Sequence, residues 1–169
     1  ALNAGVTTIL DFSHCNNTPE HSDAAVTGLL DSGVRAKFCY GFFESSPFAP
    51  PHFTDHSERV KDFERIAATY FSGADRVTLG VALNELGLVP FSNTRTEIDV
   101  ARAHDALIAT HMACVWQMPS GFDEIADAGL LGPDMVHIHC NTLSDEQWRR
   151  LADAGSKVSI SVETETNMG

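Results

Sequence analysis

Six short apolar runs alternate with stretches of helical periodicity along the chain, and this order limits the possible folds more than any other feature. The runs predicted as strands are residues 5–12, 35–43, 76–83, 107–111, 135–139 and 157–162. The predicted helices are residues 23–30, 56–71, 94–106, 122–128 and 144–155. In the third helix Thr94 is the expected N-cap, with Glu97 three residues later. In the fifth, Ser144 is the expected N-cap, and Gln147 three residues later completes a capping box. Nearly continuous apolar strands are typical of parallel α/β sheets, whose strands are covered on both faces.

This βα order fits two architectures. One is a complete doubly wound open sheet. The other is an incomplete (β/α)8 barrel, because a whole barrel needs about 250 residues and at least about 200. The chain has 169 residues, which we interpret as a single domain, residues 1–169. It opens on what resembles a helix end and stops just after Met168, in an expected loop, and these ends favour the partial barrel.

The composition narrows the range of partners. A formal net charge of −12 repels phosphate backbones, so nucleic-acid binding through a basic patch is not expected. No apolar run approaches the roughly 20 residues that span a bilayer, and the N-terminus lacks the features of a secretory signal. The four cysteines form no CxxC pair. These features favour a cytoplasmic protein with reduced thiols and no membrane partner.

Histidines at strand ends carry the strongest chemical signal. His111 ends one predicted strand, and His137 and His139 lie in the next. Residues two apart on a strand point to the same face, so His137 and His139 are expected to share one. If the two strands are parallel neighbours, His111 and His139 meet at the C-terminal rim, where barrel active sites lie, and their imidazoles can bind one divalent ion. Structural roles for these histidines are the alternative.

Other polar residues follow strands in the same way. His14 could face a substrate at this rim, or be a polar loop residue, and the same choice holds for Asn84 and Glu85. Trp116 and Met118 fit either a substrate pocket or loop packing. We interpret four further histidines as surface residues: His21, His52, His56 and His104.

Several segments resemble a known family in the order in which that family has them. GVTTILD at residues 5–11, Thr110-His111, GLLGPDMVHIHC at 129–140 and VSISVETE at 158–165 are similar to strands two, five, six and seven of the amidohydrolase superfamily. The similar branch contains cytosine and guanine deaminases and triazine aminohydrolases and chlorohydrolases. The resemblance implies a partial (β/α)8 TIM-type barrel covering about strands 2–7. It also implies one divalent metal, zinc or iron, with His111 and His139 matching the ligands on strands five and six.

The implied activity is hydrolysis of a C–N or C–Cl bond in a small nitrogen heterocycle, most simply a deamination. Three residues are candidates for binding substrate or supporting the ligands: His137, Glu165 and His14. One departure puts the deaminase proton-transfer scheme in doubt, because Cys114 stands where many members carry a glutamate, and neither Glu163 nor Glu165 can simply be assigned its role.

A catalytically inactive barrel fragment that acts as a binding or structural module is the alternative function. An opened barrel leaves two strand edges unpaired. We therefore expect the isolated chain to self-associate, to swap elements or to be unstable, and a homo-oligomer is the expected state.

Overall fold

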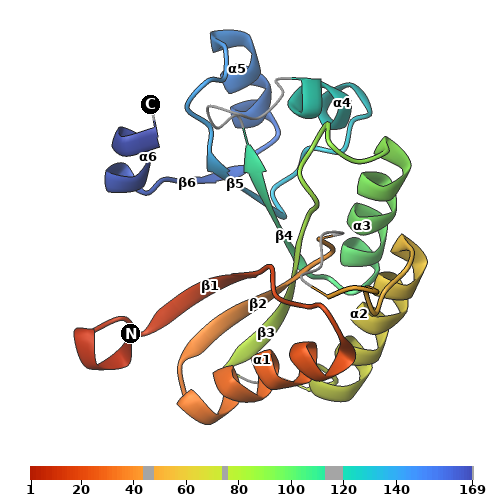
Figure 1. The fold of residues 1–169 in the computed structure, drawn as a ribbon. Helices are drawn as coiled ribbons and strands as arrows, with labels where there is room; N and C mark the ends of the chain where they lie inside the picture. The colour runs from red at the N-terminus through yellow and green to blue at the C-terminus, as the bar shows by residue number, and fades with distance from the viewer. Residues whose placement is uncertain (44–47, 74–75, 113–119, 169) are drawn as a thin grey trace.

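A computed structural model describes residues 1–43, 48–73, 76–112 and 120–168. Its centre is a six-stranded parallel sheet in the order β1 to β6 (Figure 1). The strands are β1 (Thr8–Ser13), β2 (Arg35–Gly41), β3 (Val77–Ala82), β4 (Leu107–Met112), β5 (Met135–His139) and β6 (Lys157–Ser159). Each strand pairs with the next along the chain, so every carboxyl end lies at the same rim of the sheet.

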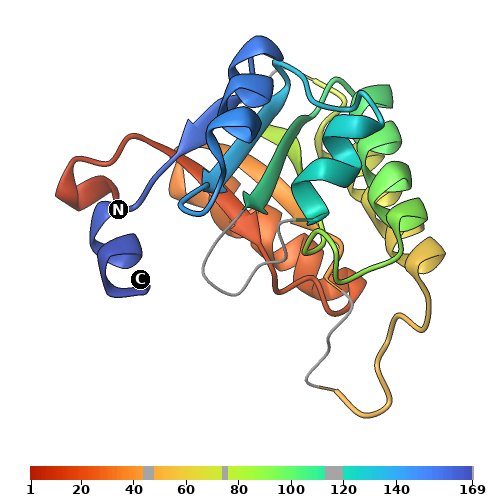
Figure 2. The same ribbon diagram turned by 90° about the horizontal axis from the view of Figure 1, so that it is seen from above.

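This strand order decides between the two predicted architectures. A doubly wound sheet reverses its strand order at a switch point, whereas here the order is sequential throughout. The sheet curls, and α1 to α5 lie along its outer side (Figures 1 and 2). The partial TIM-type barrel is therefore confirmed.

Local sequence signals explain where the main helices begin and end. The helices are α1 (Pro19–Ser32), α2 (His56–Tyr70), α3 (Phe91–Ala103), α4 (Ser120–Asp127), α5 (Asp145–Asp153) and α6 (Val162–Met168), with a 3-10 turn η1 (Leu2–Ala4) before β1. Pro19 occupies the first turn of α1, and Gly33 ends that helix with φ +70°. Asp55 caps α2. The predicted capping box of Ser144 and Gln147 is confirmed at α5.

The two faces of the sheet differ sharply in packing. The outer face meets the helices in one large cluster of buried side chains, which includes Phe38, Phe63 and Ile66. The concave face carries only a small cluster of Cys39, Ala82 and Ala109, with Phe12 and Ile138 packed against it. The stability of the fold therefore comes mainly from the helix-covered face.

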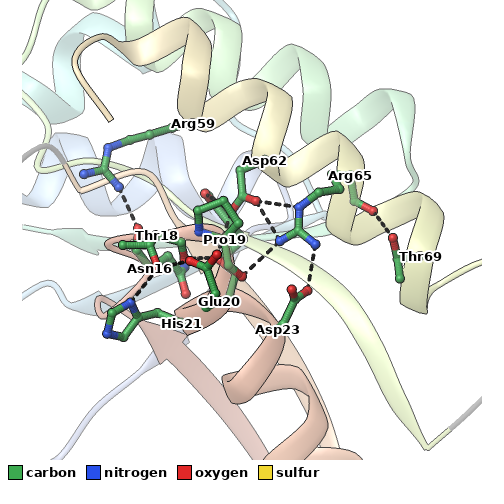
Figure 3. A network of polar contacts seen from close by, with 12 residues as sticks. Asn16, Thr18, Pro19, Glu20, His21, Asp23, Arg59, Asp62, Arg65 and Thr69 are labelled. Carbon is green, nitrogen blue, oxygen red and sulfur yellow. Dashed lines mark hydrogen bonds and ion pairs between the residues drawn. The ribbon is translucent and has the colours of Figure 1, made fainter. Parts of the chain in front are cut away.

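A polar network joins α1 and α2 above β2. The buried Asp62 accepts hydrogen bonds from Ser22 Oγ (2.8 Å) and Tyr40 OH (2.9 Å). Arg65 bridges Asp62 and Asp23, with Nε and Nη1 contacts of 2.9 and 2.7 Å (Figure 3). Because each buried polar atom has a partner, this network fixes the helix pair on the sheet without the cost of an unsatisfied group.

Several predictions of element boundaries are wrong, and three of them concern the ends of the sheet and the start of α3. The first strand begins at Thr8, since residues 2–4 form η1. Helix α3 begins at Phe91, so Thr94 and Glu97 are buried residues inside it rather than its cap. The last strand ends at Ser159 instead of residue 162, because α6 begins at Val162 and the Glu165 carboxylate accepts a hydrogen bond from the Ser161 amide (2.9 Å).

Among the described residues, no helix combines the length and apolar character needed to cross a membrane. The described cysteines, Cys15, Cys39 and Cys140, are free thiols.

Candidate metal centre at the carboxyl rim

Four titratable side chains come together at the carboxyl rim of the sheet. His14 follows β1 directly, Glu85 lies three residues after β3, His111 lies in β4, and His139 ends β5. Parallel pairing of each strand with the next places these strand ends at one rim of the sheet. Such rims are where (β/α)8 barrels build their active sites.

His111 occupies the middle of this group. Its Nδ1 lies 2.9 Å from Glu85 Oε1, with both side chains about one-fifth exposed. The ring stacks on Phe12, with centroids 4.2 Å apart, and lies 5.4 Å from the His14 ring. The carboxylate and the aromatic face together fix the orientation of the imidazole.

His139 reaches the same place through an unusual backbone. It has φ +80° and the following Cys140 has φ +67°, in the left-handed region that non-glycine residues rarely adopt. Its ring lies 5.5 Å from that of His111, and its Nδ1 is 3.1 Å from Glu165 Oε1 on α6. The structure thus gives His139 a carboxylate partner of its own.

The expectation that His137 and His139 share a face is wrong. Met135, two residues before His137, belongs to the helix-side cluster, and His137 is fully buried. Regular alternation would send His139 the same way, but its left-handed backbone turns the ring toward His111, on the concave side. Neither ring nitrogen of His137 has a hydrogen-bond partner among the described residues. Within the described part of the chain, His137 therefore makes no side-chain hydrogen bond through which it could support the site as predicted.

Burial lowers the pKa of two histidines, His14 and His137. It lowers the pKa of His137 to about 4. The pKa of His14 is lowered by partial burial and by His111 nearby, with Glu85 opposing the shift. Both rings therefore favour the neutral form, and neutral imidazole is the form that binds metals.

A compact donor group suitable for a cation is present at this rim. One ligand atom each from His14, Glu85 and His111 lie within 4.8 Å of one another. Imidazole nitrogen and carboxylate oxygen are the donors of many zinc sites. His139 lies outside this group but faces His111, and the site residues therefore fit a divalent ion.

The backbone that carries His14 is held from two sides. Asn16, which is 1% exposed, exchanges hydrogen bonds with Ser13, and its carbonyl accepts one from Arg59 Nη1 at 2.9 Å (Figure 3). Gly41 allows the close approach of β2, because a Cβ there would meet the Ser13 carbonyl oxygen at 2.2 Å. The turn after β1 is thus anchored in the core.

The residues around Glu85 are anchored by a carboxylate that the sequence did not single out for this role. Glu97, whose side chain is 0% exposed, accepts hydrogen bonds from the backbone and side-chain amides of Asn84 (2.9 and 2.8 Å). It also contacts His56 Nε2 at 2.9 Å. The prediction that His56 is a surface residue is wrong, since it begins α2, its side chain is only 14% exposed, and its ring contacts Glu97 of α3. His21, His52 and His104 are exposed, as predicted.

Sequence reasoning thus located His111, and it weighed His14 and Glu85 as weaker candidates. It missed Glu97 and His56, which lie in α3 and α2, far in sequence from the strand ends they support. Glu163 is exposed. Three residues weighed for the pocket and for proton transfer, Cys114, Trp116 and Met118, lie outside the described residues.

Comparison with known proteins supports the architecture. No protein-family model matches the sequence, and no curated protein sequence matches it. Among solved structures, the chain is similar to a triazine hydrolase from Arthrobacter aurescens (15% identity, TM-score 0.79), over 99% of this chain and 41% of that chain. The chain therefore shares the fold of this part of the triazine hydrolase.

Two deaminase structures show the same likeness. A zinc-bound adenosine deaminase from Xanthomonas campestris matches with 15% identity and a TM-score of 0.76, over 99% of this chain and 38% of that chain. A guanine deaminase from C. acetobutylicum, with guanine in its active site, matches with 13% identity and a TM-score of 0.79, over 99% and 42%. The chain thus spans about two fifths of the length of these enzymes.

Proposed function

We propose that this chain forms part of a metal-dependent hydrolase that acts on a C–N or C–Cl bond of a small nitrogen heterocycle. Hydrolytic deamination is the simplest case, in which water replaces an exocyclic amine and ammonia leaves. The observation that carries the proposal is the paired arrangement of His111 with Glu85 and His139 with Glu165 at the barrel rim. In many metal sites a carboxylate binds one ring nitrogen and leaves the other for the ion.

The proposed metal is zinc or iron, with His111 and His139 as ligands. Both rings have Nδ1 engaged by a carboxylate, so each presents Nε2 as the remaining donor. A divalent ion bound there supplies a nucleophile at neutral pH by lowering the pKa of a water molecule. The support from the comparisons is the fold shared with triazine hydrolase and deaminase structures, of which the adenosine deaminase holds zinc.

This chain's own residues have distinct parts in that scheme. Glu85 and Glu165 fix which nitrogen of each histidine carries the proton, because a carboxylate accepts only from N–H. Phe12, stacked on His111, gives the concave side an apolar surface suited to a planar heterocycle. His14 stands next to it, with ring centroids 4.7 Å apart, and offers a polar contact to such a substrate.

A metal assay tests the first half of the proposal. We expect the purified protein to bind about one zinc ion per chain, measured by elemental analysis after dialysis. His111→Ala should lose the ion. His104→Ala, which removes an exposed histidine at the end of α3, just before the amino end of β4, should retain it. Zinc retention in His111→Ala equal to that of the unaltered protein would refute the assignment.

A hydrolysis assay tests the second half. The zinc-loaded protein is given amino- and chloro-substituted triazines, purines and pyrimidines, and the release of ammonia or chloride is measured. We expect release from at least one of them, and none from His111→Ala. Full zinc occupancy without release from any substrate would favour the binding or structural module instead.

A further inference from the structure

Positive charge gathers at the amino end of the concave face, opposite the carboxyl rim. Cys39 of β2 belongs to the concave cluster, so the alternation of side chains places Arg35 and Lys37 on the same side. Ala82 marks the concave side of β3, and the same alternation extends back to Arg76, directly before that strand. The chain has a net charge of −12 and only 11 lysines and arginines, so this grouping of cations is uneven.

Arg35 and Arg76 are neighbours across the sheet. The register of β2 and β3 pairs Ala36 with Val77, which places the residues before them side by side. The Ala36 amide donates a hydrogen bond to the Arg76 carbonyl at 3.0 Å, so the pairing continues to this level. Adjacent strands lie about 4.8 Å apart, and like charges in such cross-strand positions are destabilising. A negative charge bound between the two side chains removes this repulsion.

An open cavity lies between these arginines and the start of β1. Its volume is about 360 Å³, and its lining residues are Leu2, Thr7, Thr8, Gly33, Arg35 and Arg76. None of these lining residues is acidic. The two threonine hydroxyls add hydrogen-bond donors to those of the guanidinium groups. The cavity therefore offers several donors to an anion and no carboxylate that repels one.

The two guanidinium groups are placed to use these donors. Within the described part of the chain, no hydrogen bond or ion pair engages the side chain of Arg35. Arg76 is held at the cavity, because its Nη1 donates to the carbonyl of Gly33, another lining residue, at 3.4 Å. A guanidinium presents five N–H donors in a planar fork that matches the oxygens of a phosphate group.

We propose that this cavity binds a phosphate group, as free phosphate or as part of a small phosphorylated molecule. Arg35 and Arg76 hold its oxygens, and the hydroxyl of Thr8, which is paired with Arg35 in the sheet, donates a further hydrogen bond. The cavity is larger than one phosphate ion requires, so an attached organic group can enter it in part. The site lies at the amino end of the strands and does not depend on the proposed metal or on the proposed hydrolysis.

The test is isothermal titration calorimetry of the whole, metal-free chain with inorganic phosphate at constant ionic strength. Removing metal prevents phosphate from binding an ion at the carboxyl rim. We expect one phosphate per chain with a Kd on the order of 1 mM. Arg35→Gln and Arg76→Gln should each weaken binding about 10-fold or more. Arg95→Gln is the control, since Arg95 lies near the start of α3 and pairs with Asp99 of the same helix, and it should change the Kd less than about twofold.

Far-UV circular dichroism verifies that each variant is folded, and either arginine variant alone suffices for the comparison. A parallel titration with glycerol phosphate separates the two sources of the group: tighter binding than that of inorganic phosphate assigns the cavity to a phosphorylated molecule, and equal or weaker binding assigns it to free phosphate. Binding that is unchanged in Arg35→Gln and Arg76→Gln, or no heat of binding up to about 20 mM phosphate, would overturn the inference. His111→Ala should bind phosphate as the unaltered protein does, so the inference and the proposed function can fail separately.

Discussion

His137 and His139 lie two residues apart on β5, yet they occupy opposite environments. His137 is fully buried on the helix-covered face, without a hydrogen-bond partner among the described residues. His139 turns through a left-handed backbone toward the concave side, where Glu165 and His111 surround it. The contrast shows that the same residue type packs into the core on the helix-covered face and makes polar contacts at the rim.

The first and largest effect concerns the helix-covered face. Phe63 is fully buried on α2 and packs against Tyr40 and Phe42, with ring centroids 5.8 and 5.7 Å apart. Phe63→Ala should lower the free energy of unfolding by about 3–5 kcal/mol, because it removes a large apolar side chain and leaves a cavity. Urea denaturation measures this change. A loss below about 1 kcal/mol would break the assignment of stability to this face.

The second effect links the two regions through Glu97. Glu97→Gln turns an amide N–H2 toward the donors of Asn84 or His56, and we expect a loss of about 1–3 kcal/mol of stability. Zinc affinity should fall by about 10-fold, because Glu85 follows Asn84 and supports His111. Glu64→Gln, whose carboxylate contacts the exposed His104, is the control and should leave both quantities nearly unchanged. Equal behaviour of the two variants would remove Glu97 from the account.

The third effect sharpens the contrast within β5. His137→Leu replaces an unpartnered buried ring by an apolar side chain of similar size, and it should stabilise the fold by about 1 kcal/mol. His139→Leu should leave stability nearly unchanged and weaken zinc binding. Urea denaturation measures the stability of each variant, and competition with a chelator measures its zinc affinity. A destabilising His137→Leu would indicate that the buried ring has a partner on which the fold depends.

The smallest effect lies at the opposite end of the sheet. Asp134, just before β5, bonds Arg102 Nε at 2.8 Å, and these hydrogen bonds hold the pKa of that carboxyl below its usual value. The pair therefore contributes stability above the ordinary carboxyl pKa near 4, and the contribution is lost as pH falls through the lower folded value.

For this pair, whose side chains are about one-third exposed, we expect Asp134→Asn to cost less than about 1 kcal/mol at pH 7. The cost should be smaller at about pH 3, because protons bind the carboxyl more readily in the unfolded state below its ordinary pKa. Urea denaturation at the two pH values measures it. A cost that does not change with pH would show that charge plays no part.

The sequence predicted the fold and part of the site for identifiable reasons. Continuous apolar strands separated by helices determine a parallel sheet, and strand-end histidines mark its rim, so His111 could be located. The turn of His139 could not be predicted, because a left-handed backbone at a histidine breaks the alternation on which the prediction rested. The Glu97 network depends on contacts between α2, α3 and the end of β3, which no local pattern encodes.

The central claim is that the rim around His111 binds a catalytic metal. The most direct measurement is the anomalous difference density of crystals of the protein grown with Zn2+, recorded above and below the zinc edge. The account predicts one strong peak about 2.0–2.1 Å from a ring nitrogen of His111 and from a ring nitrogen of His139. A fully occupied zinc elsewhere, with no peak at His111, would contradict it.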